Sequence, residues 1–94
     1  MFFIYRLHID NITIYIGRTK KNKERYRAHY KLCYNQNAKK GYNSKKYLTI
    51  RQLGIEKHQF KEFVKYEVLY ENIPEEYGKI VNCIEKTELI YGMN

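Results

Sequence analysis

The sequence predicts an α+β fold: a small, three-stranded, mostly antiparallel β-sheet flanked by helices, in the order ββααβα. Two runs rich in Ile, Tyr, Phe and Thr, residues 2–9 and 12–19, are separated only by Asp10-Asn11. Helix-compatible segments follow, and a third alternating run comes later in the chain. The 94 residues have room for one modest core, so we expect a single domain over residues 1–94.

The first two runs predict a β-hairpin, because each favours a strand and only a short polar break separates them. In the second run Ile12, Ile14 and Ile16 occupy the even positions, and Tyr15 and Gly17 are among the odd ones. Period two therefore predicts that the isoleucines point into the core and that Tyr15 and Gly17 lie on the opposite face.

The loop of this hairpin decides whether Tyr5 and Tyr15 share a face of the sheet. A two-residue Asp10-Asn11 turn without a bulge would place the two tyrosines on opposite faces. An odd loop centred on Asp10 would place them on the same face. We expect the odd loop.

Two helices are predicted next. Residues 22–35 contain neither Gly nor Pro, and Asn22 is available as an N-cap. After a polar loop over residues 36–43, a second helix is expected from about Lys45 to Leu53, closed by Gly54.

The last third of the chain predicts a strand and a final helix. Residues 60–70 alternate between apolar and polar positions, which indicates a third strand. Pro74 is well placed at the first position of a helix that runs to about Tyr91.

Charge is concentrated in one segment of the chain. The net charge is +8 and the isoelectric point is near 9.5. Residues 18–46 hold eleven Lys or Arg and one acidic residue, an excess of +10 (11 − 1). Such a segment is typical of a surface that binds a polyphosphate backbone.

Membrane association and a disulfide framework are not expected. No stretch approaches about 20 apolar residues, and the apolar start lacks the basic region of a signal peptide. Cys33 and Cys83 lie far apart without metal-binding spacing, so we expect free thiols in a reducing compartment. The expected location is the cytoplasm, with the nucleus or a virus-infected host cell as alternatives.

Three short pieces carry most of the functional information: Phe3-Ile4-Tyr5, Tyr15-Ile16-Gly17 and Arg25-Tyr26-Arg27-Ala28-His29. Together they resemble the GIY-YIG nuclease superfamily, whose small domain hydrolyses phosphodiester bonds. The family's leading glycine is Phe3 in this chain. Since that glycine is not chemically required, the difference weakens the motif more than the mechanism.

The resemblance implies a metal-dependent endonuclease that cleaves DNA with one Mg²⁺ or Mn²⁺ ion. It implies Tyr5 as general base and Tyr15 as the residue that orients water or phosphate. A tyrosine with a pKa of about 10 is a poor base at neutral pH, so we expect neighbouring cations to lower this pKa.

The helix motif supplies a cation and an imidazole one turn apart. The resemblance implies that Arg25 is catalytic, and a planar guanidinium suits a bidentate grip on phosphate oxygens. His29 faces the same side of the helix and is expected to bond either the phosphate or the tyrosine.

The metal ligand is expected on the final helix. The resemblance favours Glu85, an acid within an apolar run, and it suggests that Asn94 supports the site. Helical phase alone favours Glu88, which lies nearest the centre of an apolar stripe, where a charge is costly unless paired or metal-bound.

Further residues are expected to contact the nucleic acid. Gly17 is expected to allow close approach of a backbone. The expected backbone contacts are cations: Arg18, Lys20, Lys21, Arg27, Lys45 and Lys46. DNA is favoured over RNA as partner, and specificity would require a homodimer or a targeting partner.

A non-catalytic, basic nucleic-acid-binding module with the same fold is the alternative. Lysines interspersed with tyrosines in the basic segment suit binding of strands by charge and stacking. A small basic structural protein is the third possibility.

Overall fold

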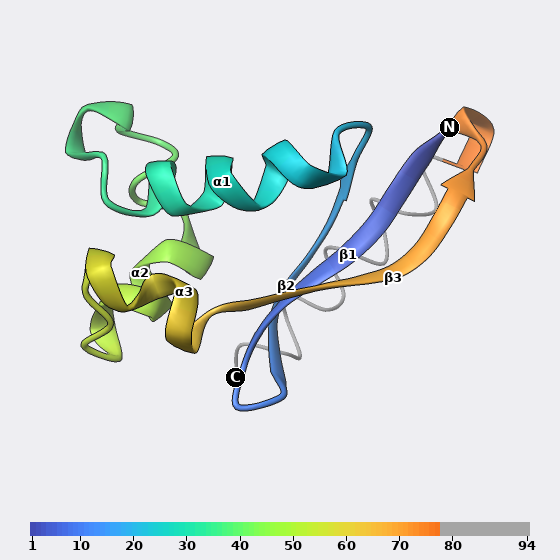
Figure 1. The fold of residues 1–94 in the computed structure, drawn as a ribbon. Coiled ribbons are helices and arrows are strands. Elements are labelled where there is room, and N and C mark those ends of the chain that lie inside the picture. Colours follow the sequence, from blue (N-terminus) through green and yellow to red (C-terminus); the bar gives the residue numbers. More distant parts are fainter. Residues whose placement is uncertain (78–94) are drawn as a thin grey trace.

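The computed structural model describes residues 1–77 of the chain, and the predicted α+β class is confirmed (Figure 1). Three antiparallel strands form one sheet in the order β2-β1-β3. The strands and α-helices are β1 (Phe2–Ile9), β2 (Ile12–Thr19), α1 (Asn22–Cys33), α2 (Lys45–Gln52), α3 (Phe60–Phe63) and β3 (Lys65–Ile73). Short 3₁₀ turns cover Gln36–Ala38, Lys57–Gln59 and Glu75–Tyr77.

The third strand begins later than the sequence predicts. The first residues of the expected strand form α3 instead, and β3 extends to Ile73. The cause is local: Glu56 and Gln59 form a capping box that starts a helical turn. The turn buries Phe60 completely. The remainder of the expected final helix, with Cys83, Glu85, Glu88 and Asn94, lies outside the described residues.

The hairpin has a two-residue turn, so the expected odd loop is wrong. Asp10 and Asn11 both have positive φ, 49° and 65°. Two such residues match the tight primed turns that suit the twist of β-hairpins. Ile9 pairs with Ile12 directly beside the turn.

A β-bulge nevertheless places Tyr5 and Tyr15 on one face, as predicted. The register shifts between Leu7, which pairs with Tyr15, and His8, which pairs with Thr13. The extra residue on β2 is therefore Ile14. Beyond the bulge Tyr5 pairs with Gly17, so the two tyrosines and the glycine share a face.

The same bulge overturns the prediction of one isoleucine face. Ile14 belongs to the core cluster that contains Tyr5. Ile16 packs with Phe2 and Ile4 in a second cluster. Ile12, beside the turn, is 64% exposed. An uninterrupted period of two would have given all three isoleucines the same environment.

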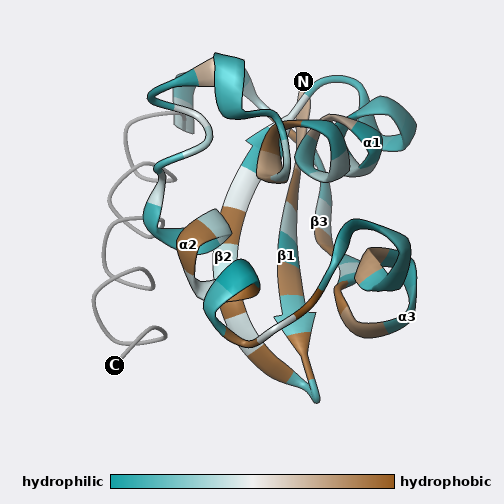
Figure 2. Ribbon diagram, turned by 90° about the vertical axis from the view of Figure 1, so that its left-hand side faces the viewer, coloured by the Kyte–Doolittle hydropathy of each residue, from teal (hydrophilic) through white to brown (hydrophobic). Residues whose placement is uncertain are grey.

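Helices α1, α2 and α3 cover one face of the sheet (Figures 1 and 2). Tyr5 points to this face, since its hydroxyl bonds Arg25 and His29 of α1. The core on this side joins residues of β1, β2, α1, α2 and α3 with the segments beside α3: Tyr5, Leu7, Ile14, Cys33, Tyr47, Ile50, Ile55, Phe60 and Val64. Each fully buried aliphatic or aromatic side chain contributes about 1.5–3 kcal/mol by leaving water. Gly54, with φ +80°, closes α2 as predicted.

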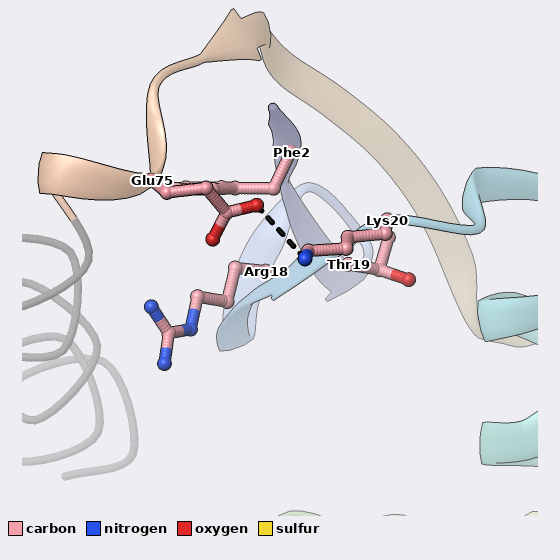
Figure 3. A pocket seen from close by; sticks show the side chains of 5 residues that line it. All are labelled: Phe2, Arg18, Thr19, Lys20 and Glu75. Carbon is pink, nitrogen blue, oxygen red and sulfur yellow. Dashed lines mark ion pairs between the residues drawn. The ribbon is translucent and has the colours of Figure 1, made fainter.

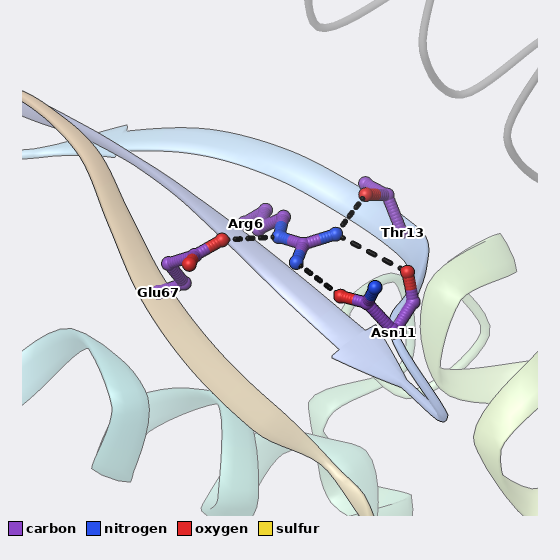
Figure 4. A network of polar contacts seen from close by, with 4 residues as sticks. All are labelled: Arg6, Asn11, Thr13 and Glu67. Atoms are coloured by element: carbon purple, nitrogen blue, oxygen red, sulfur yellow. Dashed lines mark hydrogen bonds and ion pairs between the residues drawn. The ribbon is translucent and has the colours of Figure 1, made fainter.

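A polar network fixes the hairpin on the opposite face (Figure 4). Arg6, on β1, donates from Nε to Glu67 Oε1 on β3 at 2.6 Å. Its terminal nitrogens donate to Thr13 Oγ1 at 2.9 Å and to Asn11 Oδ1 at 2.7 Å. One guanidinium therefore connects all three strands and the turn, which supports the register that positions Tyr5.

Candidate active site

The hydroxyl of Tyr5 is held by two side chains of α1. Arg25 Nε donates a hydrogen bond to Tyr5 Oη at 2.9 Å, and Tyr5 Oη lies 2.6 Å from His29 Nε2. Arg25 and His29 are four residues apart and thus point the same way from the helix. The structure therefore brings together three of the residues that the sequence predicts for the site.

His29 bonds tyrosines on both sides of its ring. Its Nδ1 lies 2.6 Å from Tyr47 Oη, and its side chain is completely buried. Of the two expected partners, phosphate or tyrosine, the structure shows tyrosine. Burial lowers the pKa of His29 to about 3, with help from the cations of Arg25 and Lys46. The imidazole is therefore neutral at physiological pH.

Neutrality of His29 sets the direction of the hydrogen bonds. Arg25 can only donate, so Tyr5 accepts from it and its own O–H is available for His29 Nε2. The remaining proton of His29 then sits on Nδ1 and donates to Tyr47 Oη. The result is a directional chain from Arg25 through Tyr5 and His29 to Tyr47.

The pKa of Tyr5 is raised in the structure, whereas the sequence led us to expect that neighbouring cations lower it. Burial raises the pKa of Tyr5 well above its ordinary value, and the nearby Tyr15 adds to the rise. The hydrogen bond from Arg25 acts in the other direction and does not overcome burial. Tyr5 is fully buried and, in the free protein, neutral.

Tyr15 and Gly17 complete the packing around the Tyr5 hydroxyl. The ring of Tyr15 lies 6.1 Å from that of Tyr5 and 5.5 Å from that of His29. A Cβ on Gly17 would lie 2.5 Å from Tyr5 Oη and 2.6 Å from Tyr15 Cε2. Gly17 is buried, and its missing side chain leaves room for the tyrosines rather than for a ligand.

Lys46 is the cation of α2 that reaches the tyrosines. Its ammonium lies 4.4 Å from the ring centre of Tyr15 and 4.7 Å from that of Tyr47. Cations over aromatic rings at this distance are attracted to the negative π-face. The neighbouring Lys45 is exposed.

The cations at the end of β2 are divided between two surfaces. Lys21 lines a shallow hollow together with Arg25, and Lys20 borders both this hollow and the pocket that contains Arg18. Arg18 instead lies on the other face of the sheet, 5.7 Å from the ring centre of Phe2 (Figure 3). Strand alternation explains this, because neighbours in a strand point to opposite faces and Arg18 follows Gly17.

Ion pairs already engage some of these cations. Lys20 Nζ lies 3.0 Å from Glu75 Oε1, as Figure 3 shows, and Lys21 Nζ lies 3.8 Å from Glu24 Oε2. Both pairs are solvent-exposed and contribute little to stability. A phosphate can therefore replace the carboxylates at low cost.

Sequence reasoning missed Tyr47 and Tyr66. The ring of Tyr66 stacks on Tyr5 with centres 4.6 Å apart, and its hydroxyl bonds Asn22 Oδ1. Tyr47 holds the far side of His29. The chain has eleven tyrosines, and no spacing marks these two, because only the packing of α2 and β3 brings them to Tyr5.

The expected metal ligand, Glu85, lies outside the described residues. Within residues 1–77 no group of three or more His, Cys, Asp or Glu side chains is placed to hold a metal ion.

Comparisons with known proteins leave the function to be inferred from this geometry. No protein-family model matches the sequence, and neither a curated protein nor a solved structure matches it significantly. No helix within residues 1–77 has the length and apolar character needed to cross a membrane.

Burial of neutral His29 predicts acid-sensitive stability. Its pKa is about 3 in the folded chain and about 6.5 unfolded, so the unfolded chain binds more protons between these values. Stability therefore falls as pH drops below the unfolded pKa. From about pH 7.5 to about pH 5.5, His29 alone should remove about 1.4 kcal/mol from the free energy of unfolding.

Urea unfolding at the two pH values measures this loss. The pKa of His8 is also lowered, by burial and by Arg6, so the comparison must isolate His29. The variant His29→Gln should be less stable and should show a smaller pH dependence than the unmodified protein. An unchanged pH dependence would show that His29 does not titrate as the structure indicates.

Proposed function

We propose that this chain is a metal-dependent endonuclease of the GIY-YIG type that hydrolyses phosphodiester bonds of DNA. The observation that carries the proposal is the Tyr5 hydroxyl, which bonds Arg25 and His29 on one face of the hairpin. The guanidinium can stabilise negative charge on the buried phenol oxygen, and the neutral imidazole can accept the phenol proton. The excess of cations in residues 18–46 supports a phosphate substrate.

Arg25 has the free donors needed to bind a phosphate. Only its Nε is used by Tyr5, and its two terminal nitrogens have no polar partner within residues 1–77. These nitrogens form the fork that matches two oxygens of one phosphate. Arg25 can therefore grip the scissile phosphate while it stays bonded to Tyr5.

Tyr5 serves as a proton relay between water and His29. A water that attacks phosphorus gives its proton to Tyr5 Oη, and the original Tyr5 proton moves to His29 Nε2. His29 becomes an imidazolium in this step, and the negative charge of the bound phosphate offsets the burial and the cations that disfavour this charge in the free protein. The hydrogen bond from Arg25 stabilises negative charge on the phenol oxygen during this transfer. Because Tyr5 is fully buried, substrate binding must first shift a covering group such as Tyr15 to admit the water, while Arg25 stays bonded to Tyr5.

The metal is assigned to Glu85 on the resemblance alone. A divalent ion there would stabilise the leaving oxygen and part of the charge on phosphate.

Cleavage assays test the proposal directly. Purified protein with Mg²⁺ or Mn²⁺ is incubated with supercoiled, single-stranded and branched DNA, and with RNA, against an EDTA control. We expect EDTA-sensitive cleavage of DNA. If no substrate is cleaved with any divalent metal, the alternative applies: a non-catalytic nucleic-acid-binding module on the same fold.

Arg25→Ala is expected to lower the cleavage rate by about 10²-fold or more, because Arg25 stabilises charge that develops in the transition state. Duplex affinity should fall only modestly, since many other cations remain. Rates under single-turnover conditions and affinities in EDTA separate the two effects. Arg25→Lys keeps the positive charge but lacks the two parallel N–H donors of the guanidinium. Full activity of that variant would contradict the bidentate grip.

A further inference from the structure

A second basic surface lies between α1 and α3. Its hollow is lined by three cations and two tyrosines: Lys23, Tyr26, Arg27, Tyr30 and Lys61. We call this surface the α1–α3 hollow.

The tyrosines form a rigid wall of the α1–α3 hollow. Tyr26 donates from its hydroxyl to the Val64 carbonyl at 2.7 Å. The rings of Tyr26 and Tyr30 each lie 5.6 Å from the buried ring of Phe60. These contacts fix two half-buried aromatic side chains between α1 and α3 before any ligand binds, which reduces the entropy lost on binding.

The cations of the hollow form no ion pair within the described residues. Within residues 1–77 Lys23, Arg27 and Lys61 have no ion pair, although Arg6, Lys20 and Lys21 all do. Lys57 adds a fourth positive charge, with its ammonium 5.6 Å from the ring centre of Tyr30. No described carboxylate lines the hollow, so its cations repel one another and an anionic ligand relieves that repulsion.

The hollow faces away from the Tyr5 site. At about 100° per residue, Lys23 and Arg27 each lie about 160° around α1 from Arg25. The width of a helix with its side chains, about 10–12 Å, therefore separates the two groups of cations. A phosphate held by Arg25 does not reach the hollow, so the hollow requires a different phosphate.

We propose that the α1–α3 hollow is a second nucleic-acid contact, which binds the sugar-phosphate backbone outside the cleavage site. The cations neutralise phosphates, and the tyrosine rings pack against sugars or unstacked bases. A nucleic acid that contacts both Arg25 and the α1–α3 hollow wraps around α1. The hollow then anchors it at a distance from the Tyr5 hydroxyl. The contact concerns binding and does not depend on whether the chain cleaves.

Salt-dependent binding tests this contact in EDTA, where cleavage plays no part. The ligand is a fluorescent duplex of about 20 base pairs, titrated between about 50 and 200 mM salt. The variant is Arg27→Gln with Lys61→Gln, and the matched control is Lys39→Gln with Lys40→Gln, two exposed lysines away from the hollow. Thermal unfolding checks that both proteins are folded.

Loss of two phosphate contacts should reduce the log–log salt slope by about 2 and weaken binding by about tenfold, while the control changes much less. Equal losses in the two variants would overturn the proposal, because bulk charge would then explain binding. Unchanged DNA binding with lost binding of a polyglutamate peptide would also overturn it and would assign the hollow to an acidic protein.

Amide NMR shifts of the unmodified protein give a second measurement that needs no variant. Addition of the duplex should move the signals of Lys23, Tyr26, Arg27 and Tyr30. Shifts confined to the Arg25 side of α1 would contradict the proposal even if neither variant folds.

Discussion

Replacing Tyr5 by phenylalanine is expected to lower the cleavage rate by about 10³-fold, the middle of the range for losing a positioned acid–base group. The substitution removes one oxygen from a buried ring that stacks on Tyr66 and packs against Tyr15. It therefore deletes the relay to His29 while the surrounding hydrophobic contacts stay. The same change leaves the buried His29 Nε2 without a partner, at a cost of about 1–3 kcal/mol in stability.

The pH dependence of cleavage gives an independent test of the Tyr5 relay. Because burial raises the pKa of Tyr5, its deprotonated form is scarce at neutral pH. In the relay, Tyr5 reacts in its neutral form and passes its proton to neutral His29, so the single-turnover rate should change little from about pH 6.5 to about pH 9. A rise of about tenfold per pH unit would contradict the relay and would indicate that Tyr5 reacts as a tyrosinate. His29 remains neutral over this interval, so no inflection near its ordinary pKa is expected.

Tyr66→Phe is the matched control, since it removes a different tyrosine hydroxyl near the same ring. Its loss should be small, because Tyr66 bonds Asn22 and not Tyr5. A comparable loss in both variants would indicate general damage to the site. An unchanged rate for Tyr5→Phe would remove the relay from the mechanism.

The hairpin shows how far local sequence rules predict this fold. The two strands and their pairing follow from composition and from Asp10-Asn11. The bulge at Ile14 does not, because an extra residue leaves no mark in a run of alternating β-branched residues. It nevertheless decides which face carries Tyr15, so a single residue of register determines whether the predicted site forms.

The candidate active site is likewise predictable from the sequence only in part. Arg25 and His29 are predictable because helical spacing fixes their common direction. Tyr47 and Tyr66 reach Tyr5 and His29 only through tertiary packing of α2 and β3. The high pKa of Tyr5 is likewise a property of burial, which no local pattern reveals.

The distribution of charge along the sequence identifies the basic segment, but it does not show on which surfaces of the fold the cations lie. Residues 18–46 supply cations to the Tyr5 face, to the opposite face of the sheet and to the α1–α3 hollow. Strand alternation separates Arg18 from Tyr15, and helical rotation separates Arg27 from Arg25. Net charge therefore predicts polyanion binding, whereas the folded elements decide how many basic surfaces the segment forms.

Glu85→Ala is expected to lower Mg²⁺-dependent cleavage by about 10³-fold or more, because a bound ion contributes several kcal/mol to the transition state. Binding of the duplex in EDTA should be unchanged or slightly tighter, since a negative charge near phosphate is removed. Glu88→Ala is the necessary control, because the helix predicted from the sequence would have Glu88 nearest an apolar stripe of Tyr77, Ile84 and Tyr91. A carboxylate in such a stripe needs a partner or a metal.

The two variants decide between these ligands with one assay, the cleavage rate as a function of Mg²⁺ concentration. A ligand variant should need more Mg²⁺ or lose cleavage at every concentration, whereas the other variant should keep the midpoint of the unmodified protein. If Glu88→Ala loses cleavage and Glu85→Ala does not, the ligand is Glu88, and the roles of Tyr5 and Arg25 stand. If neither variant changes the Mg²⁺ dependence of an active protein, the single-glutamate metal site is wrong.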